Sequence, residues 1–347
     1  MIDVHVHAVP PNLPGVGPLS PLLKLAPETV AAELRAQMQT AGVSHALAMG
    51  QWDAGPDDPL GVNRTLAIAE LVPGLRAIGA CDPAKTDDDH FARCAEVLAT
   101  GRVVALKCYL GYLHFEPAHP NYRRYYDLAA RYRVPVMFHC GDTYSPMAKL
   151  KYAHPLGVDE VAVDHPDVRF VICHLGNPWV TDCAEVVYKN MNVWCDLSGL
   201  VVGDDGSLGT DDARDRAADL GTEVRRAMRY AERPNRFLYG TDWPLAKLGA
   251  GYIVTDFVPI THRFCKLGLR LFVGIFVQIS FIRKDGSIDF LCLHALFASF
   301  KGGLQVFRAE GSVLLGTLYD VKNQLDLRQP FLLFFCEGEI FLHLFPV

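Results

Sequence analysis

The stretch Ile2-Asp-Val-His-Val-His7 joins a β-branched run to two histidines at its carboxyl end. Such a run is typical of a buried strand. Comparable apolar runs recur at residues 43–49, 75–80, 102–107, 134–139, 168–174, 193–197 and 236–239. Segments with helical periodicity separate most of them, at 27–40, 63–71, 88–100, 122–131, 181–189 and 211–232. Eight strands alternating with helices predict an all-parallel α/β sheet, either doubly wound or closed, and a span of about 250 residues favours a (β/α)8 TIM-type barrel.

Polar residues gather where these predicted strands end, and they are His5, His7, Lys107, His139, His174 and Asp242. The carboxyl ends of barrel strands meet at one mouth, and residues two apart on a strand share a face. Each of these residues alone is weak evidence for a metal site. A single histidine at a strand end is more often structural, and residues 240–244 alone are typical of a turn. The joint placement of these polar residues at the strand ends favours a metal site, because three imidazoles and a carboxylate suit zinc or a similar ion. The carboxylate could accept a proton from water activated by that ion.

Four segments resemble one known family: Asp3-Val-His5-Val-His7, Val136-Met-Phe-His139-Cys-Gly, Ile172-Cys-His174-Leu-Gly and Tyr239-Gly-Thr-Asp242-Trp-Pro. They are similar to motifs of the amidohydrolase-related branch of the amidohydrolase superfamily. This branch includes metal-dependent hydrolases and aminocarboxymuconate-semialdehyde decarboxylase. The resemblance runs from residue 1 to about 250 and implies a distorted barrel with a divalent metal, for which we expect Zn²⁺. It implies that His5, His7, His139 and Asp242 are metal ligands, and that Asp242 and His174 are catalytic.

Lys107 leaves the number of metal ions open. In binuclear members of the superfamily a lysine on the fourth strand is carbamylated and bridges two metals, and His139 and His174 would then hold the second ion. Otherwise Lys107 is a free ammonium that binds a substrate carboxylate or pairs with an acid. We favour one ion and an unmodified lysine, because the motif set resembles the mononuclear branch. Substrate contacts are also predicted for Tyr109, Asp142 and Ser198, which follow strands four, five and seven.

Composition limits the partners and the compartment. The chain has 33 basic and 39 acidic residues, a formal charge of −6, so it has no electrostatic footprint for nucleic acid. Its ten cysteines form no regular framework, which favours a reduced, cytoplasmic compartment. The apolar stretch 267–282 is shorter than the roughly 20 residues that span a bilayer, so we do not expect a membrane anchor. The expected partner is a small-molecule substrate.

The composition changes near residue 255, so we predict a barrel domain at 1–255 and an irregular hydrophobic tail at 256–347. The first part holds 32 alanines and 5 phenylalanines, whereas the tail holds 3 alanines and 14 phenylalanines. We interpret the tail as foreign to the barrel, as an out-of-frame or fused translation would be. The family's last barrel helix has no counterpart after Leu248, so we expect it to be atypical or missing. The apolar face it would leave uncovered favours aggregation or a partner, including a second copy of the chain.

The predicted function is therefore metal-dependent hydrolysis of a C–N or C–O bond in a small molecule, through activated water. An alternative is metal-dependent, non-oxidative decarboxylation of a small carboxylic acid. A further alternative is an inactive barrel whose C-terminal part is disrupted.

Overall fold

The computed structural model describes residues 2–200 and 211–246 and four strands at 277–282, 288–293, 331–336 and 339–344. The chain forms two compact units, Met1–Cys265 and Lys266–Val347, and each is described by itself.

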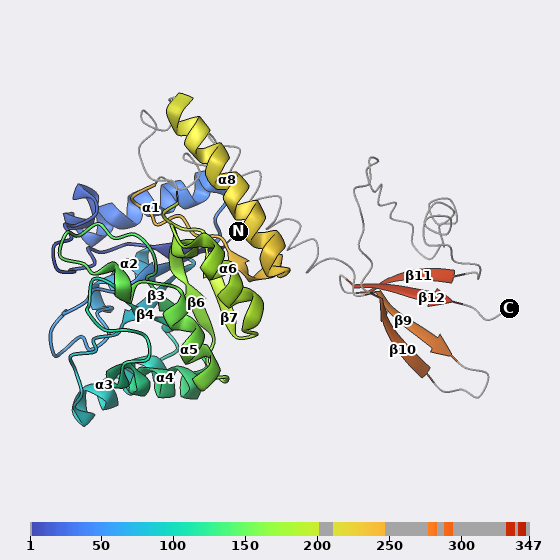
Figure 1. The fold of residues 1–347 in the computed structure, drawn as a ribbon, viewed down its shortest axis with the longest axis horizontal. Coiled ribbons are helices and arrows are strands. Elements are labelled where there is room, and N and C mark those ends of the chain that lie inside the picture. The colour runs from blue at the N-terminus through green and yellow to red at the C-terminus, as the bar shows by residue number, and fades with distance from the viewer. Residues whose placement is uncertain are drawn as a thin grey trace. The chain divides into compact units, whose positions relative to one another are not determined.

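The first unit confirms the predicted (β/α)8 barrel. Its eight strands are ordered β1 to β8, each parallel to the next (Figure 1). Their bounds are β1 Ile2–Val6, β2 His45–Met49, β3 Leu75–Ala80, β4 Val103–Cys108, β5 Val136–Phe138, β6 Phe170–Ile172, β7 Val193–Asp196 and β8 Phe237–Leu238. The segment after β8 returns to the first strand: Val4 N–H donates to Tyr239 O over 2.9 Å, and Asp242 N–H donates to His5 O over 2.9 Å. These hydrogen bonds join the last segment of the sheet to its first strand and close the barrel.

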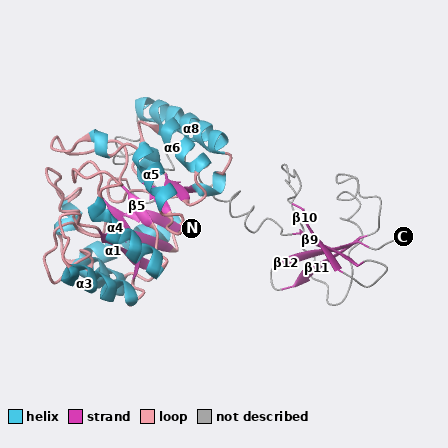
Figure 2. Cartoon of the chain, turned by 60° about the horizontal axis from the view of Figure 1, so that its bottom comes forward, coloured by secondary structure: helices cyan, strands magenta, loops and turns pink. Residues whose placement is uncertain are grey.

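Helices surround these strands (Figures 1 and 2). They are α1 Pro27–Ala41, α2 Asn63–Leu71, α3 Asp88–Ala99, α4 Pro120–Tyr132, α5 Leu156–Asp164, α6 Val180–Lys189 and α8 Asp211–Ala231. Local signals set several ends. The Asp87 carboxylate accepts a hydrogen bond from His90 N–H and caps α3, whereas α1 ends at Gly42, whose φ of +66° favours glycine. Short 3₁₀ turns lie at Pro21–Lys24, Leu150–Tyr152, Cys173–Gly176 and Pro234–Arg236.

Apolar side chains fill the barrel interior. Met49, Ile78, Ala105, Met137 and Val171, one from each of β2 to β6, form one buried cluster. A larger cluster lies between the strands and the helices. The interior layer forms the floor of the site, because the strand residues two positions further on point into the same space.

The second unit contains β9 Val277–Ile282, β10 Ile288–Leu293, β11 Phe331–Cys336 and β12 Glu339–Leu344, in the sheet order β10-β9-β12-β11. β9 and β12 pair in parallel, and the two outer pairs are antiparallel. The expected atypical or missing barrel helix concerns residues 247–276, which lie outside the described residues. Among the described residues, we find no helix with the length and hydropathy needed to cross a membrane.

Candidate active site

A cavity of about 240 Å³ opens among the residues that follow the carboxyl ends of the strands. Every residue predicted for the site lines this cavity except Ser198. Strand register explains the convergence. Lys107 lies two residues after Ala105, and His139 lies two residues after Met137, so both continue the interior face of their strands.

His174 reaches the cavity in a different way from the one predicted. Strand β6 ends at Ile172, and the next residue, Cys173, packs in the same interior cluster as Val171. His174 follows in a turn with φ of +60°. Its position therefore depends on a left-handed backbone turn and not on the strand alternation from which we predicted it.

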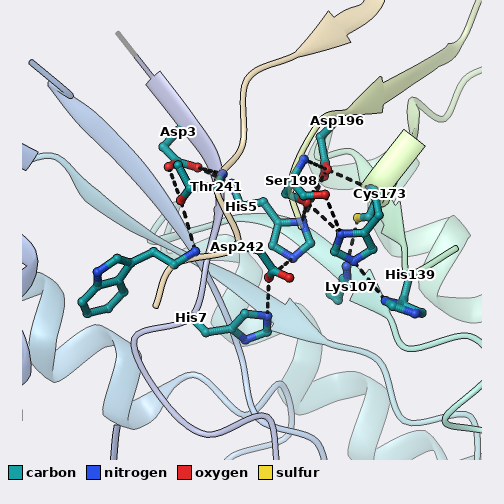
Figure 3. A network of polar contacts seen from close by, with 12 residues as sticks. Asp3, His5, His7, Lys107, His139, Cys173, Asp196, Ser198, Thr241 and Asp242 are labelled. Carbon is teal, nitrogen blue, oxygen red and sulfur yellow. Dashed lines mark hydrogen bonds and ion pairs between the residues drawn. The ribbon is translucent and has the colours of Figure 1, made fainter. Parts of the chain in front are cut away.

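A fully buried carboxylate orients His5 (Figure 3). Nδ1 of His5 lies 3.0 Å from Oδ2 of Asp196 and 2.9 Å from Oγ of Ser198. Burial and the nearby Lys107 ammonium lower the pKa of His5 to about 4, so the ring is neutral at pH 7. A neutral ring that donates from Nδ1 to a carboxylate presents the lone pair of Nε2 to the cavity.

Asp196 uses both its oxygens within the protein. Oδ1 accepts hydrogen bonds from the N–H groups of His174 and Ser198, each over 3.0 Å, and from Oγ of Ser198 over 2.5 Å. Burial by itself would raise its pKa, but the adjacent His5 and its hydrogen bond outweigh that and hold the pKa of Asp196 well below its usual range. A cluster of His5, His174 and Asp196 has spacing suitable for a metal. We interpret it as a support for the rings, because Asp196 does not line the cavity and its lone pairs are already engaged.

The other cluster with metal-ligand spacing consists of His5, His7 and Asp242. Oδ1 of Asp242 lies 3.3 Å from Nε2 of His5 and 3.3 Å from Nε2 of His7. Yet this buried oxygen has no hydrogen-bond partner among the described residues, nor has Nδ1 of His7. Burial opposes ionisation, but the two imidazoles outweigh it and lower the pKa of Asp242 below its usual range.

These donors fit a divalent cation. Nε2 of His5 lies 3.3 Å from Oδ1 of Asp242, and this buried oxygen has no hydrogen-bond partner among the described residues, which costs free energy. A cation would satisfy both, and His7 adds a third donor. Imidazole nitrogen with carboxylate oxygen suits Zn²⁺ and neighbouring transition-metal ions.

His139 and His174 form a second pair of rings beside this cluster. Nδ1 of His139 lies 3.1 Å from Nε2 of His174, and Nε2 of His139 lies 2.9 Å from the carbonyl oxygen of Asp142. Burial lowers the pKa of both histidines, and for His139 the neighbouring His174 adds to the effect. Both rings are therefore neutral at pH 7, the form in which histidine binds a metal or accepts a proton.

The predicted substrate residues have different surroundings. Tyr109 lies in the cavity wall and donates its hydroxyl to Gly50 O over 2.7 Å. Asp142 is exposed at the cavity, with Oδ1 accepting from Thr143 N–H over 2.8 Å. Ser198 is fully buried and does not line the cavity, and its hydroxyl donates to Asp196, so its predicted substrate contact stays a prediction.

Asp3 has no role predicted from the sequence, yet it links β1 to the segment that follows β8. It is fully buried, and it accepts hydrogen bonds from the Thr241 hydroxyl over 2.7 Å, from Thr241 N–H over 3.2 Å and from His5 N–H over 3.0 Å. Burial raises the pKa of Asp3 to about 7. The available signal was its position two residues before His5 in the first motif, although a register shift between Asp3 and Val6 interrupts the regular alternation of β1.

Known proteins resemble this chain in sequence and in fold. A sequence model of the family described as Amidohydrolase matches residues 2–257. A search of curated proteins finds no significant match.

Among solved structures, the chain is similar to a probable 2-pyrone-4,6-dicarboxylic acid hydrolase from Acinetobacter baumannii with citric acid bound, at 15% identity and a TM-score of 0.52, covering 77% of this chain and 94% of that one. A TIM-barrel protein from Bordetella bronchiseptica is similar at 17% identity and a TM-score of 0.52, covering 78% and 99% of the two chains. A 5-carboxyvanillate decarboxylase from Sphingomonas paucimobilis matches at 11% identity and a TM-score of 0.41, covering 63% and 74%. At these identities the likeness to the first two structures shows the fold alone.

Proposed function

The chain belongs to the amidohydrolase family, and from that premise we propose that it is a metal-dependent hydrolase that cleaves a C–N or C–O bond of a small molecule. The observation that carries the proposal is the convergence of Asp242 Oδ1 with Nε2 of His5 and Nε2 of His7, each 3.3 Å away. We propose that these three residues, with His139, hold one divalent ion, and that Zn²⁺ is that ion. A bound divalent ion polarises a carbonyl group and lowers the pKa of water.

The chain's own residues supply the proton transfers. Asp242 is ionised at neutral pH, because its neighbours lower its pKa, so it can take a proton from a water molecule in the cavity. The hydroxyl oxygen then bonds to the substrate carbon, the C–O or C–N bond breaks, and the proton passes to the leaving oxygen or nitrogen. His174 is neutral and lies in the cavity wall, so it can orient the water or hold that proton in transit.

Metal content tests the first part of the proposal. We expect one divalent ion per chain in purified full-length protein and a loss of that ion in the His5→Ala/His7→Ala variant. His45→Ala is the matched control, because His45 is an exposed histidine at the start of β2. A folded wild-type protein without bound metal, or a double variant that keeps it, would refute the proposed site.

Asp242→Asn tests the second part. The substitution keeps the size of the side chain but removes the base, so turnover of esters, lactones and amides should fall to the background rate while the far-ultraviolet circular dichroism spectrum stays unchanged. A variant that remains active would contradict the role of Asp242.

One observation favours decarboxylation as a second candidate: the cavity wall contains the buried Lys107 ammonium, which suits an acidic substrate. Release of CO₂ from a carboxylic acid, without consumption of water, would identify this reaction. Hydrolysis of an ester, lactone or amide yields an acid and an alcohol or amine instead.

A further inference from the structure

Lys107 is a buried cation without a matching anion. It is the fifth residue of β4, its side chain lines the cavity, and it is 1% exposed. Its Nζ lies 2.9 Å from Sγ of Cys173 and 5.7 Å from the ring centre of Tyr109 (Figure 3). Within residues 2–200 and 211–246, no carboxylate forms an ion pair with it.

Cys173 does not neutralise this charge. Burial raises the pKa of its thiol well above the usual value, although the adjacent Lys107 acts in the opposite direction, so Cys173 stays protonated at neutral pH. A thiol sulfur is a weak hydrogen-bond acceptor. Burying an ammonium is unfavourable unless an anion and strong acceptors compensate it.

Two other polar side chains of the cavity wall are directed toward groups other than Lys107. Asp242 faces His5 and His7, and the Tyr109 hydroxyl donates to a backbone carbonyl. Lys107 is the one lysine or arginine among the described residues that line this cavity. An anion entering the cavity would therefore meet a single lysine side chain, at a fixed place on the wall.

We propose that Lys107 is a substrate-binding residue that pairs with a carboxylate, and that the substrates are small organic acids with this carboxylate near the cleaved bond. The position of the cleaved bond rests on the proposed function, whereas carboxylate binding does not. The cavity volume of about 240 Å³ accommodates a small organic acid. In this arrangement the Lys107 side chain is unmodified and is not carbamylated.

The test compares an acid with its neutral isostere. Binding of glutarate and of glutaramide to the full-length protein as purified is measured by isothermal titration calorimetry, for the wild type and for Lys107→Met. The wild type should bind glutarate at least about 10-fold more tightly than glutaramide, and Lys107→Met should lose about 10- to 100-fold in glutarate affinity, the range expected for a hydrogen bond to a charged group. Lys85→Met is the matched control, because Lys85 is an exposed lysine that lines a separate cavity. Its glutarate affinity should equal that of the wild type.

Three results would overturn the inference. The first is equal binding of glutarate and glutaramide by the wild type, which needs no variant to fold. The second is an unchanged glutarate affinity in folded Lys107→Met with an unchanged metal content. The third is a carbamate signal in the ¹³C NMR spectrum of wild-type protein equilibrated with ¹³C-bicarbonate, absent from Lys107→Met. Because these experiments measure binding without turnover, they can succeed in a protein that fails as a hydrolase, and the reverse also holds.

Discussion

Replacing Asp196 by asparagine probes how the protein prepares His5 for a metal. The carboxylate accepts three hydrogen bonds at Oδ1 and faces Nδ1 of His5 with Oδ2, 3.0 Å away. An amide has one oxygen. If that oxygen keeps the three donors, the new NH₂ group faces the N–H of His5, and two donors meet. The hydrogen bond between His5 and residue 196 can be restored only if the ring proton moves to Nε2, the nitrogen that faces Asp242.

A proton on Nε2 of His5 would have to be displaced before a metal binds, so we expect Asp196→Asn to weaken metal binding. Loss of a carboxylate that orients a ligating histidine typically weakens metal binding about 10- to 100-fold, or roughly 1.4–2.7 kcal/mol. Competition with a fluorescent chelator measures the affinity, and the melting temperature of the metal-free protein reports whether the fold survives. Asp82→Asn is the matched control, because Asp82 is also a buried aspartate but lies outside the cavity of His5. A metal affinity of Asp196→Asn within about twofold of the wild type would refute the argument that Asp196 fixes the tautomer of His5.

Two further predictions concern stability. Trp243→Ala should lower the free energy of unfolding by about 3–5 kcal/mol, because the indole is 1% exposed and packs in the cluster behind β1 and β2; a loss below about 1 kcal/mol in urea denaturation would contradict this packing. Burial lowers the pKa of His90, so its contribution to stability is complete above the unfolded pKa of about 6.5 and is lost as the pH falls below it. Because Nε2 of His90 lies 2.7 Å from the Tyr125 hydroxyl, His90→Gln keeps a donor and should flatten the decline in stability between pH 7.5 and 5.5, whereas an unchanged decline would count against His90.

The barrel was predictable because its strands are buried on both faces. Such strands are continuous apolar runs that contrast with the amphipathic helices between them. Helix α5, Leu156–Asp164, was not predicted, and its sequence explains why. It has nine residues, no side chain caps its first turn, and it begins after Pro155 without a strong periodic face.

The site was predictable where strand alternation decides the geometry. Lys107 and His139 lie two residues after core residues of β4 and β5, and His5 and His7 lie two residues apart at the end of β1, so counting by two groups them at the cavity. The roles of Asp196 and Ser198 were not predictable in the same way. A polar residue at a strand end can face a substrate or support another side chain, and only the contacts of its neighbours show which occurs.

The hydrogen bonds that complete the barrel also position the donors of the proposed metal site. Asp3 binds the hydroxyl and N–H of Thr241, and the backbone N–H of Asp242 binds the carbonyl of His5. The distance between the His5 ring and the Asp242 carboxylate is therefore set where the last segment of the sheet meets the first strand. A divalent cation bound by these two residues would link the same two segments. The contacts that close the barrel would therefore also affect metal affinity. The buried, unpartnered oxygen of Asp242 has a physical cost that a protein without a cation at this position would bear with no compensation.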